Sequence, residues 1–96
     1  MTTLQQLRLR RDEILSLAAA HGASNLWLFG SVARGTDDEA SDIDIMVDLE
    51  PGRSLLDLGE LQVELGELLG VEVDVVTNNG LRGRIRDEAL KDARPL

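Results

Sequence analysis

Three aspartates fall in two short alternating segments, where their carboxylates could together bind a divalent metal. Asp42 and Asp44 are two residues apart in one such segment, and Asp74 lies in another. Residues two apart on a strand project from the same face, so Asp42 and Asp44 would lie close together. Two like charges about 4 Å apart repel by roughly 4 kcal/mol at an effective dielectric near 20, and a bound cation reverses that sign. Magnesium suits these residues because it prefers carboxylate, water and phosphate oxygens.

A glycine and a serine upstream of this pair could bind a phosphate group. Gly30 and Ser31 follow an apolar segment, and Gly30 precedes Asp42 by twelve residues. A glycine lets the backbone approach a phosphate closely, and the amide and hydroxyl of a serine at a helix start can donate to it. Two Mg2+ ions bridged by Asp42 and Asp44 could then activate an attacking hydroxyl and stabilise a leaving pyrophosphate.

Each of these features also has an ordinary structural interpretation. A Gly-Ser pair after a strand is commonly a turn, and an Asp-Ile-Asp strand is commonly a solvated outer face. Asp74 could be an edge-strand charge that discourages aggregation, and Glu72 and Asp48 share the outward faces of the same strands. We rank Asp74 above both because a parallel pairing of the two strands favours it. The combination of features, more than any one of them, indicates an anion site beside a metal site.

The elements that must position these residues follow from hydrophobic periodicity and turn residues. The expected helical segments are residues 3–20, 31–34, 54–70 and 81–93, and the expected strands are residues 25–29, 42–49 and 71–76. The long helix between the second and third strands requires a crossover, so these strands should be parallel, while the first two could be antiparallel. The expected fold class is α/β (α+β), a small mixed three-stranded sheet flanked by about four helices.

Local signals define the helix between the second and third strands. Ser54 and Asp57 resemble a capping box at its start, and Gly70 is placed to end it. Gly59 and Gly66 lie inside it, where each costs about 1 kcal/mol relative to alanine. They indicate either close packing within the chain, which we take as the default, or the approach of a partner.

The composition limits the number of domains and the choice of metal ligands. Ninety-six residues with 43% hydrophobic content predict one domain over residues 1–96. The chain has no cysteine and one histidine, so a metal would have to bind carboxylate oxygens. His21 falls in the last turn of the first expected helix, where it suits the helix dipole better than catalysis.

Charge and hydropathy bear on partners and compartment. A formal net charge of −8 argues against direct nucleic-acid binding, which relies on lysine and arginine releasing counterions from phosphates. No apolar segment approaches the roughly 18 to 20 residues of a membrane span, and the N-terminus lacks the apolar core of a signal peptide. We therefore expect no membrane association and a cytoplasmic location.

A longer motif links the phosphate-binding pair to the aspartates. Gly30-Ser31, ten intervening residues and Asp42-Ile43-Asp44 form the pattern G-S-x10-D-x-D. In this the chain resembles the polymerase-β-like nucleotidyltransferase superfamily. The segments GSVARG, SDIDIMV, LEPGRSLLDL and VEVDVVT are similar to those of MNT proteins, minimal nucleotidyltransferases encoded beside HEPN-domain toxins. The resemblance covers nearly the whole chain and implies a nucleotidyltransferase fold.

The resemblance also implies a role for each motif residue. The metal-binding and catalytic residues would be Asp42, Asp44 and Asp74, and the nucleotide-binding residues would be Gly30, Ser31 and Arg34. Whether Arg34 contacts phosphate or a partner stays open. One departure is the acidic run at residues 37–39, which adds negative charge near the expected triphosphate and bears on affinity more than on mechanism.

The function implied by this resemblance is that of an antitoxin. The leading hypothesis is a Mg2+-dependent protein adenylyltransferase that transfers AMP from ATP to a hydroxyl, expected to be a tyrosine, of a cognate HEPN toxin in a hetero-oligomer. The chain contains no tyrosine, so a tyrosyl acceptor must belong to another protein. The alternative is a non-catalytic antitoxin that inhibits by stoichiometric binding, although the intact aspartates favour catalysis. A small-molecule nucleotidyltransferase of the antibiotic-modifying kind is weaker, because those relatives carry an additional domain.

Overall fold

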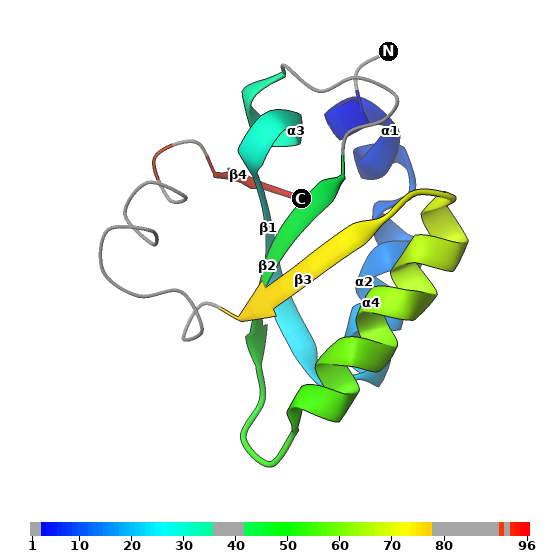
Figure 1. Ribbon diagram of the computed structural model, residues 1–96, viewed down its shortest axis with the longest axis vertical. Helices are drawn as coiled ribbons and strands as arrows, with labels where there is room; N and C mark the ends of the chain where they lie inside the picture. The colour runs from blue at the N-terminus through cyan, green and yellow to red at the C-terminus, as the bar shows by residue number, and fades with distance from the viewer. Residues whose placement is uncertain (1–2, 36–41, 78–90, 92) are drawn as a thin grey trace.

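The structure is a computed structural model that describes residues 3–35, 42–77, 91 and 93–96, apart from the side chains of Ser31 and Arg34. The expected acidic loop at residues 36–40 and nearly all of the expected helix at residues 81–93 lie outside the described residues. The described elements alternate between helices and strands, which confirms the mixed α+β class (Figure 1). Their bounds are α1 Thr3–Leu9, α2 Arg11–Ala20, β1 Ala23–Phe29, α3 Gly30–Arg34, β2 Ile43–Leu49, α4 Leu55–Leu69, β3 Val73–Thr77 and β4 Arg94–Pro95.

The strands form one mixed sheet in the order β3-β2-β1-β4. β1 pairs with β2 antiparallel and β2 pairs with β3 parallel, which confirms both pairings expected from the connections. The expectation of three strands is wrong, because β4 pairs antiparallel with β1 through Trp27 and Leu28. β4 has two residues, too few for a visible alternation. One of them is a proline, which is tolerated at a sheet edge although it cannot donate to the ladder.

The expected single helix over residues 3–20 is also wrong, because the chain breaks at Arg10 into α1 and α2. Arginine is a good helix former, so the residue type at this position does not predict the break. The Arg10 guanidinium donates a 2.9 Å hydrogen bond to the Leu68 carbonyl of α4 and pairs with Glu13 at 3.1 Å. Gly22, with φ of +75°, adopts the expected left-handed conformation after α2.

The other helices follow their sequence signals closely. α3 confirms the expected helical turn, and Gly35 ends it with φ of +74°. The capping box of α4 is confirmed, because the Ser54 hydroxyl accepts a 3.2 Å hydrogen bond from the Leu56 amide and the Ser54 amide donates to Asp57 at 3.1 Å. Gly70 ends α4 in the left-handed conformation. Among the described helices, none has both the length and the apolar character needed to cross a membrane.

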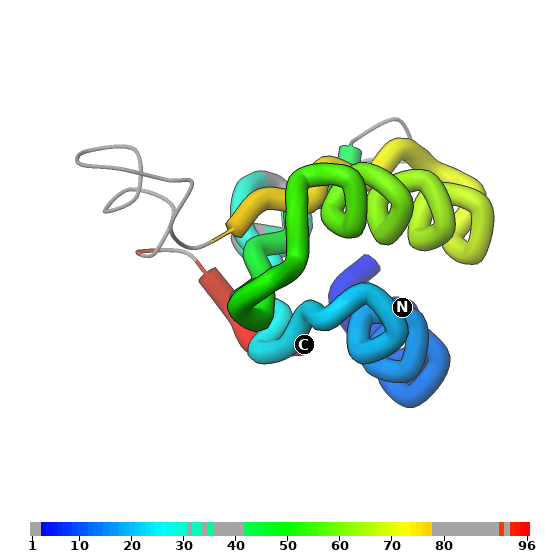
Figure 2. Tube along the Cα trace, turned by 90° about the horizontal axis from the view of Figure 1, so that it is seen from below, coloured from blue at the N-terminus to red at the C-terminus, as the bar shows by residue number. Residues whose placement is uncertain are grey.

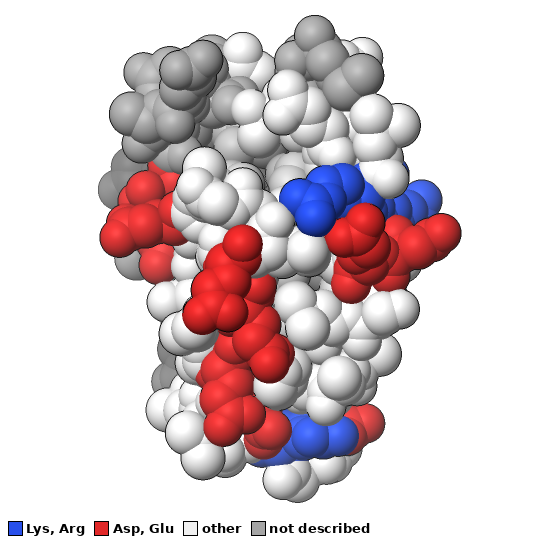
Figure 3. All heavy atoms as spheres, turned by 90° about the vertical axis from the view of Figure 1, so that its right-hand side faces the viewer, with Lys and Arg blue, Asp and Glu red and all other residues white. Residues whose placement is uncertain are grey.

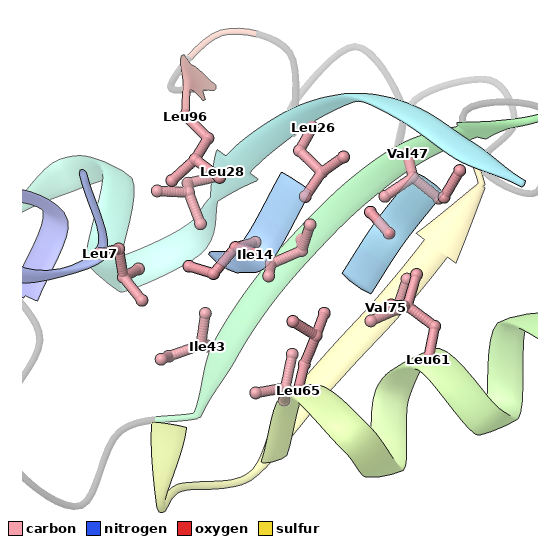
Figure 4. Packing of buried hydrophobic residues seen from close by; sticks show 14 of the residues in the cluster. Leu7, Ile14, Leu26, Leu28, Ile43, Val47, Leu61, Leu65, Val75 and Leu96 are labelled. Carbon is pink, nitrogen blue, oxygen red and sulfur yellow. The ribbon is translucent and has the colours of Figure 1, made fainter. Parts of the chain in front are cut away.

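The core lies between the sheet and the two longest helices, α2 and α4. These helices lie side by side on one side of the sheet (Figure 2). Large apolar side chains from α2, β1, β2 and α4 meet between them, as Figure 4 shows. The largest fully buried ones include Ile14, Leu28, Ile45, Leu61 and Leu65. This packing holds α4 against the sheet and so fixes the position of β3, the strand that follows it.

The two faces of β2 are less distinct than its alternation predicts. Ile43, Ile45 and Val47 are buried in the core, as expected. Met46 is also buried, at 3% exposure, although it alternates with them and lies outside that cluster. The polar character of the second face is therefore limited to its aspartates, Asp44 and Asp48.

The two faces of α4 should differ sharply in their response to the same substitution. Leu65→Ala removes a fully buried side chain and should lower the free energy of unfolding by about 2–5 kcal/mol, because it leaves a cavity. Leu56→Ala is the matched control, since Leu56 is 71% exposed in the same helix, and it should change that energy by less than about 0.5 kcal/mol. Urea denaturation followed by circular dichroism measures both. Equal losses for the two variants would contradict the assignment of the buried face.

Candidate active site

The parallel pairing of β2 and β3 places Asp44 directly beside Asp74. The two residues are register partners, between the Ile43–Val73 and Ile45–Val75 pairs. The Ile43 amide donates a 3.0 Å hydrogen bond to the Glu72 carbonyl, which fixes this register at the start of β2. Neighbouring strands lie about 4.8 Å apart, and register partners in a sheet project on the same side. The expected closeness of these two aspartates is therefore a consequence of the sheet.

Asp42 lies one residue before β2 begins and is exposed. It was expected to be the first residue of that strand, so the difference is one position. Among the residues that the structure describes, the three aspartates do not form a group whose ligand oxygens all lie within 4.8 Å of one another. The backbone thus brings Asp44 and Asp74 together, while Asp42 lies at the rim of the site beside residues outside the description.

Gly30 lies against the Asp44 carboxylate because the β1–β2 pairing brings the end of β1 back to it. The last residue of β1, Phe29, is the register partner of Asp44. Gly30 has φ of +72°, in the left-handed region that favours glycine. A Cβ atom at this position would lie 2.6 Å from Oδ2 of Asp44. Any side chain at this position would push the Asp44 carboxylate aside, so the turn that was expected to bind phosphate adjoins a carboxylate expected to bind metal.

The remaining two expected nucleotide-binding residues, Ser31 and Arg34, belong to α3. Their side chains lie outside the described part of the chain, so the roles expected for them stay predictions. α3 packs against both β1 and β2, which keeps its backbone near the paired strands.

The site presents carboxylate oxygens that a ligand can reach. Asp42 and Asp74 are exposed and Asp44 is half-buried. Carboxylate oxygens with room for water and substrate phosphate are the donors that Mg2+ prefers, so these residues fit that ion. The arrangement is suited to binding a metal-complexed polyphosphate.

A second group of possible metal ligands was missed in the sequence. His21 after α2 and Asp57 and Glu60 of α4 each offer a ligand atom, and these atoms all lie within 4.8 Å of one another. His21 Nε2 also contacts the Glu64 carboxylate, and its Nδ1 lies 3.7 Å from Glu60. Asp57, Glu60 and Glu64 follow a helical spacing that puts them on one face of α4, which was the available signal.

This second group lies away from the aspartate site and is already engaged in local contacts. His21 lies two residues before Ala23, the first residue of β1. Ala23 pairs with Leu49, whereas the last residue of β1 pairs with Asp44. The group therefore adjoins the opposite end of the β1–β2 pair. Asp57 also pairs with Arg53 at 3.5 Å, and the hydrogen bond from Arg53 to Glu50 raises the pKa of Arg53.

Comparison with known proteins identifies the family. The nucleotidyltransferase domain family matches residues 11–96. A Methanocaldococcus jannaschii protein named as a candidate protein adenylyltransferase is 44% identical over 86% of this chain and 89% of its own length. The protein adenylyltransferase MntA of Thermococcus cleftensis is 38% identical over 84% of this chain and 90% of its own.

Solved structures agree with this assignment. The structure of a candidate minimal nucleotidyltransferase, 50% identical, superposes with a TM-score of 0.85 over 100% of this chain and 97% of its own. A toxin-antitoxin structure with AMP-PNP is 24% identical, with a TM-score of 0.75 over 88% of this chain and 69% of its own, and shows the fold alone. The matches in sequence agree with the fold and with the paired aspartates. This chain therefore belongs to the nucleotidyltransferase domain family and resembles its minimal members.

Proposed function

We propose that this chain is an antitoxin that transfers AMP from ATP to a hydroxyl side chain, expected to be a tyrosine, of a cognate HEPN-domain toxin and so neutralises it. The MntA relative is named as a protein adenylyltransferase, which supports transfer to a protein. One fold neighbour is a tri-AMPylated Shewanella oneidensis HEPN toxin in complex with its MNT antitoxin, which makes such a toxin a reasonable acceptor to test.

The observation that carries the proposal is the juxtaposition of Gly30, Asp44 and Asp74. Two carboxylates side by side on neighbouring strands repel each other, and a cation bound between them turns that repulsion into attraction. A glycine whose replacement would displace the Asp44 carboxylate adjoins that residue. Metal-bound phosphates need both features, whereas a purely structural strand end needs neither.

Two Mg2+ ions would be held by the three aspartates, Asp42, Asp44 and Asp74. When bound, Mg2+ neutralises phosphate charge and makes the attacking hydroxyl more acidic. Asp44 and Asp74 keep their carboxylates side by side through the strand register, and the Gly30 backbone leaves room for the phosphates beside them.

In the proposed reaction, the acceptor oxygen forms a bond to the α-phosphorus of ATP while the bond from that phosphorus to pyrophosphate breaks. Pyrophosphate leaves with the bonding electron pair, and the hydroxyl proton passes to solvent or to a nearby carboxylate. The acceptor belongs to a second protein if it is a tyrosine, because this chain has none.

Transfer should depend on Asp44 specifically. Asp44→Asn keeps the size of the side chain but removes its charge, and should reduce transfer by about 100-fold or more, as losses of groups that stabilise charge in a transition state do. Asp48→Asn on the same strand is the control; Asp48 is exposed and accepts a hydrogen bond from Asn25.

The transfer is measured as the gain in intact mass of a HEPN-domain protein encoded beside this chain (the neighbouring HEPN-domain protein), after incubation with ATP, Mg2+ and this chain. The native chain and Asp48→Asn should add adenylyl mass. A toxin that stays blocked without gaining mass would instead identify a stoichiometric antitoxin.

The Gly30 contact predicts a second loss of transfer. Gly30→Ala places a Cβ 2.6 Å from Asp44 Oδ2 and should displace that carboxylate, lowering transfer by about tenfold or more. Gly35→Ala is matched in backbone, with φ of +74° against +72°, but meets nothing within 4 Å. Both variants therefore carry similar backbone strain, and equal transfer rates for the two would contradict the proposed role of the contact.

Nucleotide and metal together should stabilise the fold by linkage. At a concentration 100 times Kd, a ligand that binds the native state alone adds about 2.7 kcal/mol, so Mg2+ with ATP should raise the Tm by several degrees. ATP with a chelator should raise it much less. The double variant Asp42→Asn, Asp44→Asn should lose the rise in a thermal shift assay, and an unchanged rise would place the nucleotide elsewhere.

A further inference from the structure

A shallow groove begins at Asp74 and runs along α4. It has a volume of about 590 Å3. Its lining includes Val63, Gly66 and Gly70 on the helix side and Val71, Glu72 and Asp74 on the strand side. Because Asp74 belongs to the proposed metal site, a molecule in this groove would reach the site directly. We call this surface, together with the adjoining exposed positions Leu56 and Gly59 of α4, the α4 groove.

The α4 groove has apolar and small residues that the fold itself does not use. Leu56 and Val63 are 71% and 61% exposed. Gly59 is exposed, and a Cβ there would meet nothing within 4 Å, so the default expectation of internal packing is wrong for it. For Gly66 that expectation is confirmed, since a Cβ would meet the Val71 carbonyl at 3.3 Å. Gly59 lowers helix stability with no compensating contact within the described part of the chain, which is the pattern expected where a partner packs closely.

The groove is also strongly acidic. Glu67, Glu72 and Asp74 line it and form no ion pair with another described residue. α4 has no basic residue in its last turn, where cations would suit the helix dipole and where glutamates oppose it. Figure 3 shows acidic side chains in a band on this side of the molecule, with uncharged surface beside it. A partner with basic side chains would neutralise charges that the chain leaves unpaired.

The sheet edge beside the groove is protected against a partner strand. β3 is an edge strand, but the Val75 amide already donates a 2.9 Å hydrogen bond to the Gln62 side chain of α4. A strand added at this edge would have to displace that bond. Exposed apolar positions at helical spacing on α4 instead suit an amphipathic helix laid along it.

We propose that the α4 groove docks a basic, amphipathic helix of the protein that accepts the adenylyl group. This inference rests on the proposed function and adds the surface through which the acceptor is recognised. Apolar side chains of that helix pack over Val63 and against Gly59, while lysine or arginine side chains meet Glu67 and Glu72. The groove then leads the acceptor hydroxyl toward Asp74.

Three arginine substitutions test the docking surface with the same change in net charge. Val63→Arg and Gly59→Arg add bulk and positive charge inside the α4 groove, whereas Ser16→Arg adds them at an exposed position of α2. Binding of each variant to the neighbouring HEPN-domain protein is measured by calorimetry, at low and at high salt. The two groove variants should weaken binding by about tenfold or more, and Ser16→Arg by less than about twofold. Binding of the native chain should weaken as salt rises.

Folding is checked in the same variants. Gly59→Arg replaces a helix-interior glycine with a better helix former, so its Tm should equal or exceed that of the native chain. Weakened binding with an undiminished Tm would therefore reflect the surface and not the fold.

The outcomes separate this inference from the proposed function, because adenylyl transfer is measured in parallel. If the native chain transfers AMP and the groove variants bind as tightly as Ser16→Arg, the docking surface is wrong and the proposed function stands. If the groove variants weaken binding but the native chain transfers no AMP, the docking surface is supported and catalysis is overturned. If the native chain neither binds nor modifies this protein, both proposals fail.

Discussion

The parallel register of β2 and β3 is the constraint on which the site depends. It makes Asp44 and Asp74 partners, although 30 residues of sequence separate them. The β2–β3 connection includes α4, which is capped at both ends and buries Leu61 and Leu65 completely. Burying a leucine contributes roughly 1.5–3 kcal/mol, so a few such side chains offset the repulsion between two carboxylates. The core thus holds together charges that would otherwise separate.

The second constraint is the antiparallel pairing of β1 with β2. It returns the end of β1 to the level of Asp44, and Gly30 follows at once with a backbone conformation that other residues rarely adopt. The close contact with the Asp44 carboxylate depends on the missing side chain. A turn and a carboxylate that are fourteen residues apart in sequence thereby become one surface, open to a ligand from the side of Asp42 and Asp74.

The sequence predicted the site's backbone well and its surroundings less well. Alternation in β2 and β3 and the long helix between them indicate parallel strands, so the approach of Asp74 to the Asp42–Asp44 pair could be inferred, whereas the register that makes Asp44 its partner comes from the structure. The break at Arg10 could not be inferred, because Arg10 is a good helix former and its contact with the Leu68 carbonyl of a distant helix is visible only in the structure. β4 is too short for any periodicity to reveal.

The side-chain contacts that could not be predicted also depend on packing between segments that are distant in the sequence. His21 meets carboxylates of α4 only after α2 and α4 pack side by side, so the helical spacing of those carboxylates does not by itself reveal His21 as their partner. Gly59 looked like a packing residue because the sequence does not show which face of α4 is covered. The resemblance to minimal nucleotidyltransferases added the role of each residue, which periodicity alone does not supply.

The proposed function requires that the aspartates, and not the histidine group, bind the catalytic metal next to Gly30. A crystal structure with Mn2+ and a non-hydrolysable ATP analogue tests it most directly, because anomalous scattering locates manganese independently of the refined coordinates. We expect anomalous peaks in contact with Asp44 and Asp74 and a phosphate against the Gly30 backbone. Peaks confined to His21, Asp57 and Glu60, with the aspartates free of metal and nucleotide, would contradict it.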